Sequence, residues 1–81
     1  MKMAFIGGGV MAEAIIDGIL SKNIAKAQDL VVGEVLSERR NHLKGTYSID
    51  VTANNVAAAQ RGDIVILSTK PQNLAMVLQE L

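Results

Sequence analysis

The apolar residues of the chain fall into short runs and helix-spaced stretches that follow one another regularly. Strands are predicted at Met3–Ile6, Leu30–Glu34, Ser48–Thr52 and Ile64–Ser68. Helices are predicted at Val10–Leu20, from Ser37 to near Lys44-Gly45, at Val56–Gln60 and at Gln72–Leu81. Uninterrupted apolar runs are typical of parallel strands that are buried on both faces. The alternation of strand and helix therefore predicts an α/β fold of Rossmann-like βαβ units around a mainly parallel sheet.

The first helix carries an apolar stripe at helical spacing, which we expect to face the sheet. The stripe comprises Met11, Ala14, Ile15, Gly18 and Ile19. Such spacing places residues on one side of a helix. Because glycine weakens a helix, Gly18 predicts a close packing contact at this point.

Capping residues and helix breakers predict where several elements begin and end. Ser37 is the predicted N-cap of the second helix, and Asn54 or Asn55 is that of the third. Pro71, after Lys70, ends the last strand because proline lacks the N–H that a ladder needs.

Composition excludes several classes of protein. The chain has 81 residues, 49% of them apolar, so it forms one compact unit rather than a disordered segment. The formal net charge of zero gives a nucleic-acid partner no electrostatic support. The chain contains no cysteine, and no run approaches the ~18 apolar residues of a membrane span. Glycines interrupt the first apolar run, which argues against a signal peptide. We therefore expect a cytoplasmic protein without a membrane or nucleic-acid partner.

Three glycines, Gly7 to Gly9, separate the first strand from the first helix. With Ala12 they give the spacing Gly7-x-Gly9-x-x-Ala12, a variant of the dinucleotide-binding fingerprint. Gly7 permits a sharp turn, Gly9 permits close approach of a pyrophosphate, and Ala12 lets the helix pack near the strand. The free N–H groups at the start of the helix then favour a bound anion.

Glu34, 25 positions after Gly9, ends the second strand. A Rossmann fold places an acid there, ~20 residues after the glycines, to bind the adenosine ribose. Arg39 and Arg40 follow, and a guanidinium grips a ribose 2′-phosphate well. The two signals oppose each other, because Glu34 repels the 2′-phosphate that the arginines attract. The alternative is that Glu34 is a solvated carboxylate and that the arginines are exposed beside Glu38.

Ser68-Thr69-Lys70-Pro71 follows the fourth strand, at the edge where open α/β sheets bind ligands. The Ser68 hydroxyl and Lys70 are candidates for the nicotinamide ribose or a phosphate, although Lys70 also reads as a solvated loop lysine. The spacing of carboxylates indicates no metal site, and the glycine loop lacks the G-K-[ST] of a P-loop. His42 has no neighbour at triad-like spacing. No residue is therefore assigned as catalytic.

Several segments together resemble pyrroline-5-carboxylate reductases, over essentially all 81 residues. They are Met3-Ala-Phe-Ile-Gly-Gly-Gly-Val-Met-Ala-Glu-Ala-Ile-Ile, Ser37-Glu-Arg-Arg, Asn54-Asn55 and Asp63-Ile-Val-Ile-Leu-Ser-Thr-Lys-Pro-Gln72. That family reduces 1-pyrroline-5-carboxylate to proline with NAD(P)H. The resemblance implies a cofactor site in which the pyrophosphate lies on Ile6, Gly7, Gly8, Gly9, Val10 and Met11. It also places Glu34 and Asn55 on the adenosine side, and Ser68, Thr69, Lys70 and Pro71 on the nicotinamide side.

The chain also departs from the family. Val10 replaces an Asn or Gln, and Glu34-Val35-Leu36 replaces an Asp-Arg-Ser-like segment. Ser68-Thr69 replaces an Ala-Val pair. Loss of a basic and a hydroxyl side chain weakens recognition of a 2′-phosphate, so NADP and NAD both stay open.

The resemblance covers only the N-terminal part of a larger dinucleotide-binding domain. The family's helical C-terminal domain, which provides the substrate contacts and the oligomer, is absent from residues 1–81. We therefore expect a homo-oligomeric parent enzyme with a small imine substrate, and no useful turnover by these 81 residues alone. An autonomous small α/β domain is the alternative.

Two further functions stay open at this point. One is another NAD(P)-linked reductase, either an F420-dependent NADP reductase or an enzyme of the β-hydroxyacid dehydrogenase type. The other is a nucleotide-sensing domain without catalysis.

Overall fold

A computed structural model describes residues 1–69 and residue 79. Their four strands, β1 (Met3–Ile6), β2 (Leu30–Gly33), β3 (Asp50–Thr52) and β4 (Ile64–Leu67), form one sheet in the order β3-β2-β1-β4. All three pairings are parallel. The predicted α/β fold is thus confirmed. The helix predicted at Gln72–Leu81 falls, except for Gln79, outside the described residues.

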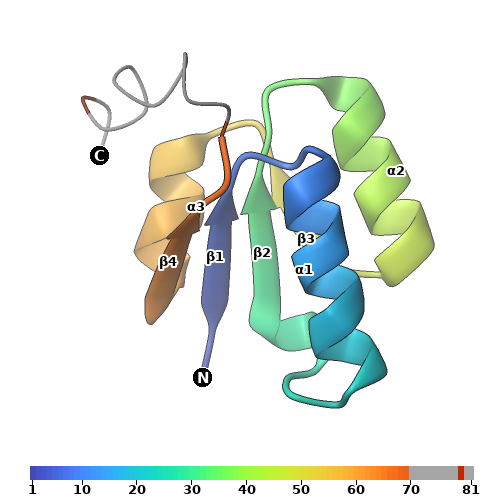
Figure 1. The fold of residues 1–81 in the computed structure, drawn as a ribbon. Coiled ribbons are helices and arrows are strands. Elements are labelled where there is room, and N and C mark those ends of the chain that lie inside the picture. Colours follow the sequence, from blue (N-terminus) through green and yellow to red (C-terminus); the bar gives the residue numbers. More distant parts are fainter. Residues whose placement is uncertain (70–78, 80–81) are drawn as a thin grey trace.

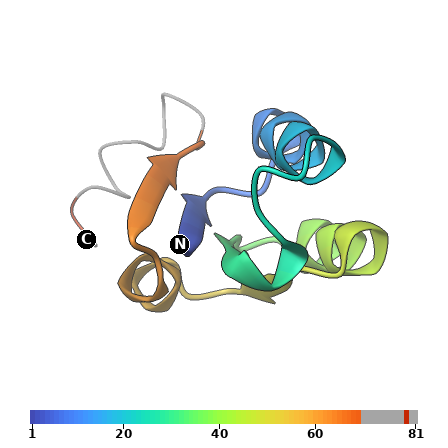
Figure 2. The same ribbon diagram turned by 90° about the horizontal axis from the view of Figure 1, so that it is seen from below.

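Helices cover both faces of the sheet (Figures 1 and 2). The helices α1 (Val10–Ser21) and α2 (Ser37–Tyr47) lie on one face, and α3 (Asn55–Arg61) lies on the other. Alternation along the central strand explains this, because successive side chains of a strand point to opposite faces. Phe5 joins the cluster under α1 and α2, whereas its neighbours Ala4 and Ile6 join the cluster with Ala58 of α3.

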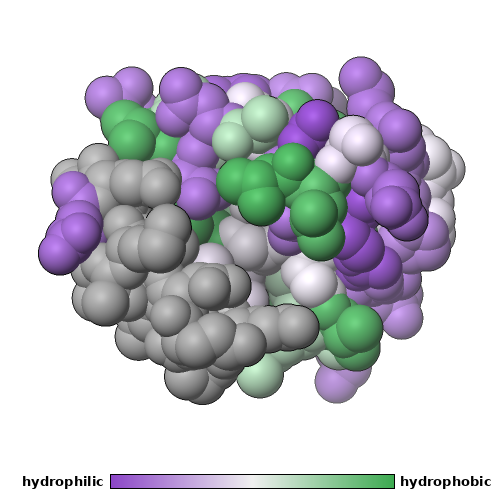
Figure 3. Space-filling model, turned by 90° about the horizontal axis from the view of Figure 1, so that it is seen from above, coloured by the Kyte–Doolittle hydropathy of each residue, from purple (hydrophilic) through white to green (hydrophobic). Residues whose placement is uncertain are grey.

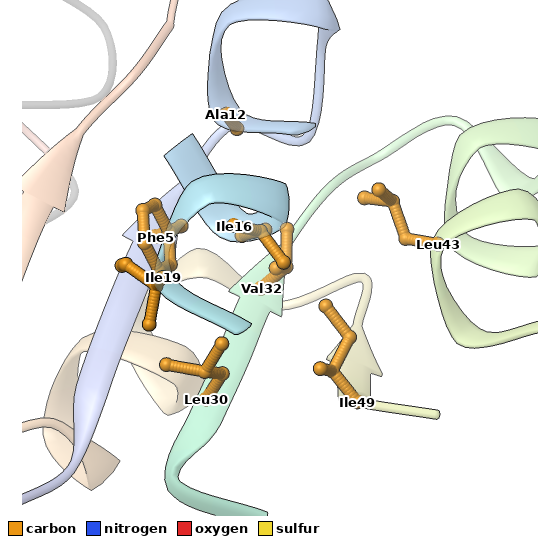
Figure 4. Packing of buried hydrophobic residues seen from close by; sticks show 8 residues of the cluster. All are labelled: Phe5, Ala12, Ile16, Ile19, Leu30, Val32, Leu43 and Ile49. Atoms are coloured by element: carbon orange, nitrogen blue, oxygen red, sulfur yellow. The ribbon is translucent and has the colours of Figure 1, made fainter. Parts of the chain in front are cut away.

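The larger core cluster fixes α1 and α2 to the sheet (Figure 4). It comprises Phe5, Ala12, Ile16, Ile19, Leu30, Val32, Leu43 and Ile49, each at most 8% exposed. Ala12 and Leu43 lie at the end of this cluster nearest the glycine turn, so burial there positions the turn itself. The predicted role of Ala12 as a small packing residue agrees with its complete burial.

The predicted apolar stripe of α1 is wrong except for Ile19. The buried residues are Ala12, Ile16 and Ile19, while Met11, Ala14, Ile15 and Gly18 are exposed. In the part of the chain that the structure describes, a Cβ at Gly18 would meet nothing within 4 Å, so no close contact there explains this glycine. The helix is apolar on nearly all sides, and two stripes fit the same helical period. Spacing alone therefore did not select the buried one.

The second helix begins and ends differently from the prediction. Ser37 is its first residue, Leu36 is the N-cap, and no side chain caps it. The helix continues through Gly45 to Tyr47 and ends at Ser48, whose φ of 59° is left-handed. Because Ser48 ends the helix, β3 begins at Asp50 rather than at the predicted Ser48.

The cap of the third helix is confirmed as Asn54. Its side-chain oxygen accepts a hydrogen bond of 3.0 Å from the backbone N–H of Ala57. This satisfies one of the free N–H groups in the first turn of α3.

Candidate cofactor-binding site

The strand order reverses between β1 and β4, and this point defines the candidate site. Gly7–Gly9 follows β1, and Ser68-Thr69 follows β4 at the same edge of the sheet. In open α/β sheets, ligands bind beyond the carboxyl ends of the strands where the order reverses. The two segments that the sequence singled out are therefore neighbours. Lys70 and Pro71, also predicted to belong to the site, lie outside the described residues.

Gly7 occupies a position that only glycine fits. Its φ is +103°, a conformation that L side chains rarely adopt. A Cβ there would lie 2.9 Å from the Thr69 Cγ2 atom and 3.0 Å from the Ser68 carbonyl carbon. The backbone N–H of Gly7 donates to the Gly33 carbonyl at 2.8 Å. The turn is thus fixed to the ends of both β2 and β4.

Ser68 holds the glycine turn from the inside. Its hydroxyl lies 2.7 Å from the carbonyl oxygen of Gly7 and 3.1 Å from that of Ile6. The residue is 9% exposed. The sequence placed this hydroxyl toward the nicotinamide ribose; the structure directs its proton to the backbone of the turn. The neighbouring Thr69 hydroxyl is buried without a hydrogen-bond partner among the described residues.

Gly8 is buried and held by side chains from beyond β2. Its N–H donates to the Glu34 Oε1 atom at 2.7 Å, and its carbonyl accepts from the Arg39 Nε–H at 2.8 Å. A Cβ at Gly8 would lie 2.9 Å from the Leu43 Cδ1 atom and 3.1 Å from the Glu34 Cβ atom. The packing of α2 therefore requires the smallest residue here.

Gly9 differs from its two neighbours because no described residue crowds it. A Cβ there would meet nothing within 4 Å among residues 1–69, and its φ of −80° suits any residue. Gly9 is also the N-cap of α1, and no side chain caps this helix. The first N–H groups of the helix thus lack a side-chain partner, the arrangement in which helix termini bind phosphates. The uncapped start of α1 at Gly9 is therefore the candidate position for a phosphate group.

The side chains proposed to select the cofactor are already engaged within the protein. The Glu34 carboxylate also accepts from the Leu36 N–H at 2.9 Å. Arg40 donates to the carbonyl oxygens of Glu34 and Val35 at 2.8 and 2.9 Å. Arg39 binds the Gly8 carbonyl and Glu13 rather than Glu38. These contacts shape the loop that would face the adenosine ribose.

A cluster around Glu13 was not recognised from the sequence. The Glu13 carboxylate accepts from Arg39 at 2.8 Å and from the Tyr47 hydroxyl at 3.0 Å, and it lies 3.0 Å from the His42 Nε2 atom. Hydrogen bonds from His42, Arg39 and Tyr47 lower the pKa of Glu13 to about 2. Burial and the Glu13 carboxylate raise the pKa of Tyr47. His42 therefore has an acidic neighbour in space that linear spacing did not reveal.

Spacing along α2 is a signal for only part of this cluster. Arg39 and His42 are three positions apart, which places them on one side of a helix, whereas the five positions from His42 to Tyr47 do not. That side faces Glu13 in the first turn of α1.

Asn55 lies buried beside the end of β2. Its Oδ1 atom would stand 2.6 Å from a Cβ at Gly33, so that glycine makes room for the amide. The Oδ1 atom is buried and has no hydrogen-bond partner among the described residues. A buried acceptor without a partner is costly.

Exposed apolar residues surround the carboxyl edge of the sheet (Figure 3). Val10 and Met11 follow the glycine turn, and Val35 and Leu36 follow β2; each is at least 60% exposed. An apolar surface beside a candidate phosphate-binding turn suits a ligand that combines phosphates with an aromatic base. Among the described residues, no helix is long and apolar enough to cross a membrane.

Comparison with known proteins identifies the fold and the family. The model of the family described as NADP oxidoreductase, coenzyme F420-dependent, matches residues 2–81. A pyrroline-5-carboxylate reductase from Synechocystis sp. is 37% identical over the whole chain, which spans 30% of that relative. A reductase of the same name from Pseudomonas aeruginosa is 36% identical over 99% of the chain and 29% of its own length.

A solved structure agrees with these similarities. The pyrroline-5-carboxylate reductase from Coxiella burnetii superposes with a TM-score of 0.92 at 29% sequence identity, covering 99% of this chain and 29% of that one. The chain thus spans about 30% of the length of the curated relatives it matches. The resemblance to the N-terminal domain of these reductases is confirmed, and the cofactor class is NADP or NAD. The chain therefore belongs to the NADP oxidoreductase family described as coenzyme F420-dependent, a family of NAD(P)-dependent oxidoreductases.

Proposed function

We propose that the protein carrying this chain reduces 1-pyrroline-5-carboxylate to proline with NADH or NADPH, as a step of proline biosynthesis. The observation that carries this proposal is the uncapped N-terminus of α1 at Gly9, which no described residue crowds, next to the Gly7 turn, which is held on both sides. Relatives named pyrroline-5-carboxylate reductase, 36–37% identical over nearly the whole chain, support the choice of substrate.

In this proposal the residues of the chain bind and orient the cofactor. Backbone groups of Ile6 to Met11 surround the pyrophosphate, and α1 presents its N-terminus to it. Glu34 and Asn55 lie toward adenosine, while Ser68 to Pro71 line the nicotinamide half. The Asn55 Oδ1 atom, which has no hydrogen-bond partner among the described residues, supports this placement.

The reaction adds a hydride to the imine carbon and a proton to the imine nitrogen. Bound NAD(P)H supplies the hydride. The contribution of residues 1–69 is to fix the cofactor, because a correctly held reactant saves much of the entropic cost of reaction. We assign the imine contacts and the homo-oligomer interface to a helical C-terminal domain of the full-length cytoplasmic enzyme.

The experiment is an absorbance assay on the full-length protein. Addition of 1-pyrroline-5-carboxylate should oxidise NADH or NADPH at a rate proportional to enzyme, with proline as the product. Cofactor binding without oxidation of either nucleotide would favour the nucleotide-sensing alternative. If the protein neither bound nor oxidised NADH or NADPH, the proposed cofactor site would be wrong.

The family match favours one second candidate. The matching family model is described as coenzyme F420-dependent. An F420-dependent NADP reductase would exchange a hydride between NADP and the deazaflavin. A direct test replaces the imine with oxidised coenzyme F420. NADPH should then reduce the deazaflavin of this coenzyme, and the absorbance of the deazaflavin should fall.

A further inference from the structure

We propose that Arg39 is a positioning residue for the glycine turn, acting on NADH and NADPH alike, rather than a ligand of the 2′-phosphate. The inference rests on cofactor binding at this turn and is independent of the substrate. Its basis is the double attachment of one guanidinium to the Gly8 backbone and to the Glu13 carboxylate.

The Gly8 peptide is fixed from both sides by residues that follow β2. Glu34 accepts from its N–H at 2.7 Å, and Arg39 donates to its carbonyl at 2.8 Å. Hydrogen bonds to charged groups are stronger than neutral ones. Since Gly9 and the first turn of α1 follow directly, the orientation of Gly8 sets where their N–H groups point.

The charge of Arg39 has a second effect at the same place. Glu13 lies in the first turn of α1, close to where a pyrophosphate would bind. An uncompensated carboxylate there would repel the phosphates. The Arg39 guanidinium places a positive charge 2.8 Å from the Glu13 carboxylate.

The sequence suggested that Arg39 binds the ribose 2′-phosphate, whereas these contacts assign it to the glycine turn. Its Nε–H and one terminal nitrogen are committed to Gly8 and Glu13, and the side chain is only 26% exposed. A side-on bidentate grip on a 2′-phosphate, through the Nε–H and a terminal nitrogen, would break the attachment to Gly8. Loss of Arg39 should therefore weaken both cofactors equally.

The test compares affinities of the full-length protein for NADH and NADPH by calorimetry, at a temperature where thermal melts show each variant folded. Arg39→Gln should weaken both cofactors by about tenfold, leaving the ratio of the two affinities unchanged. Arg61→Gln is the matched control, since Arg61 pairs with Asp50 at the opposite end of the sheet. It should leave both affinities unchanged.

Two further variants separate positioning from simple stability. Glu13→Gln in the Arg39→Gln background should recover part of the lost affinity, because it removes the uncompensated charge. Arg39→Lys, which keeps the charge but cannot make both contacts, should give a smaller loss that is equal for both cofactors; it also replaces Arg39→Gln if that variant does not fold.

A loss confined to NADPH would make Arg39 a 2′-phosphate ligand and overturn the inference. Unchanged affinities in folded Arg39→Gln would overturn it as well. If the wild-type protein bound neither nucleotide, cofactor binding itself would fail, which is a distinguishable result.

Discussion

The hydroxyl of Ser68 lies 2.7 Å from the carbonyl oxygen of Gly7, joining residues that are 61 positions apart. This contact connects the ends of β1 and β4, the two strands between which the sheet order reverses. The hydrogen bond from the Ser68 hydroxyl to the Gly7 carbonyl therefore helps to fix the geometry of the candidate site.

Replacement of Ser68 by alanine should lower the free energy of unfolding by about 1–2 kcal/mol, because the Gly7 carbonyl loses its hydroxyl partner. Urea denaturation measures this. Ser21→Ala, which removes an exposed hydroxyl 3.4 Å from Asp17, is the control and should change stability by less than about 0.5 kcal/mol. Equal stability of the two variants would show that the Ser68 contact contributes nothing.

Replacement of Gly9 by valine should abolish cofactor binding while the protein stays folded. The Cβ of the new side chain meets no described atom within 4 Å, and the side chain occupies the proposed position of the pyrophosphate. Calorimetry with NADH and NADPH, next to a thermal melt, measures both effects. Retained affinity would exclude this position as the phosphate site.

Replacement of Gly7 by alanine should have the opposite pattern, with stability as the main loss. The φ of +103° and the contact with the Ser68 backbone both oppose a side chain. Strain of this kind costs about 1–3 kcal/mol. Chemical denaturation of Gly7→Ala beside Gly9→Val tests whether the two glycines serve different purposes; equal stability of both variants contradicts it.

Replacement of Glu34 by glutamine should raise the ratio of NADPH to NADH affinity by about tenfold. The change removes a negative charge from the end of β2, near the proposed 2′-phosphate position, and keeps the size of the side chain. Glu38→Gln removes an exposed charge from the first turn of α2 and serves as the control. A ratio that does not move would place Glu34 away from the ribose.

The Glu13 cluster predicts a specific acid sensitivity. Because the pKa of Glu13 lies at about 2 in the folded protein, against an ordinary 4.5, the unfolded chain binds the proton more readily. The stabilisation is then complete above pH 4.5 and is lost as the pH falls toward 2. Denaturation of Glu13→Gln across this range should show a flatter profile than the wild type. Parallel profiles would contradict the role of Glu13.

Sequence patterns predicted the parts of the structure that local chemistry decides. Continuous apolar runs marked the strands, and Asn54 marked a cap, because each signal needs only neighbouring residues. The apolar helix α1 offered two equivalent stripes, and only the contact with β1 and β2 selected the one with Ile16. Local spacing alone does not determine which of the two stripes is buried.

In the candidate site, too, residues with a local sequence signal were predicted, whereas contacts between distant elements were not. Gly7 and Gly9 were identified from their spacing. The positive φ of Gly7 agrees with the predicted sharp turn, while the approach of a pyrophosphate at Gly9 stays a prediction. The partners of Glu13 come from another helix, so the cluster depends on tertiary packing. The commitment of Arg39 to Gly8 follows from that same packing of α2 against the turn.

The register of the central strand has a consequence for synthesis of the protein. Met3 pairs with Ile64 and Ile6 with Leu67, so β1 leaves the ribosome long before one of its two neighbours exists. At about 5–20 residues per second, the wait for β4 is roughly 3–12 seconds. Through that time the strand that leads into the glycine turn lacks its partner on one side. The glycine turn at the phosphate end of the site can therefore be completed only after β4 has been synthesised.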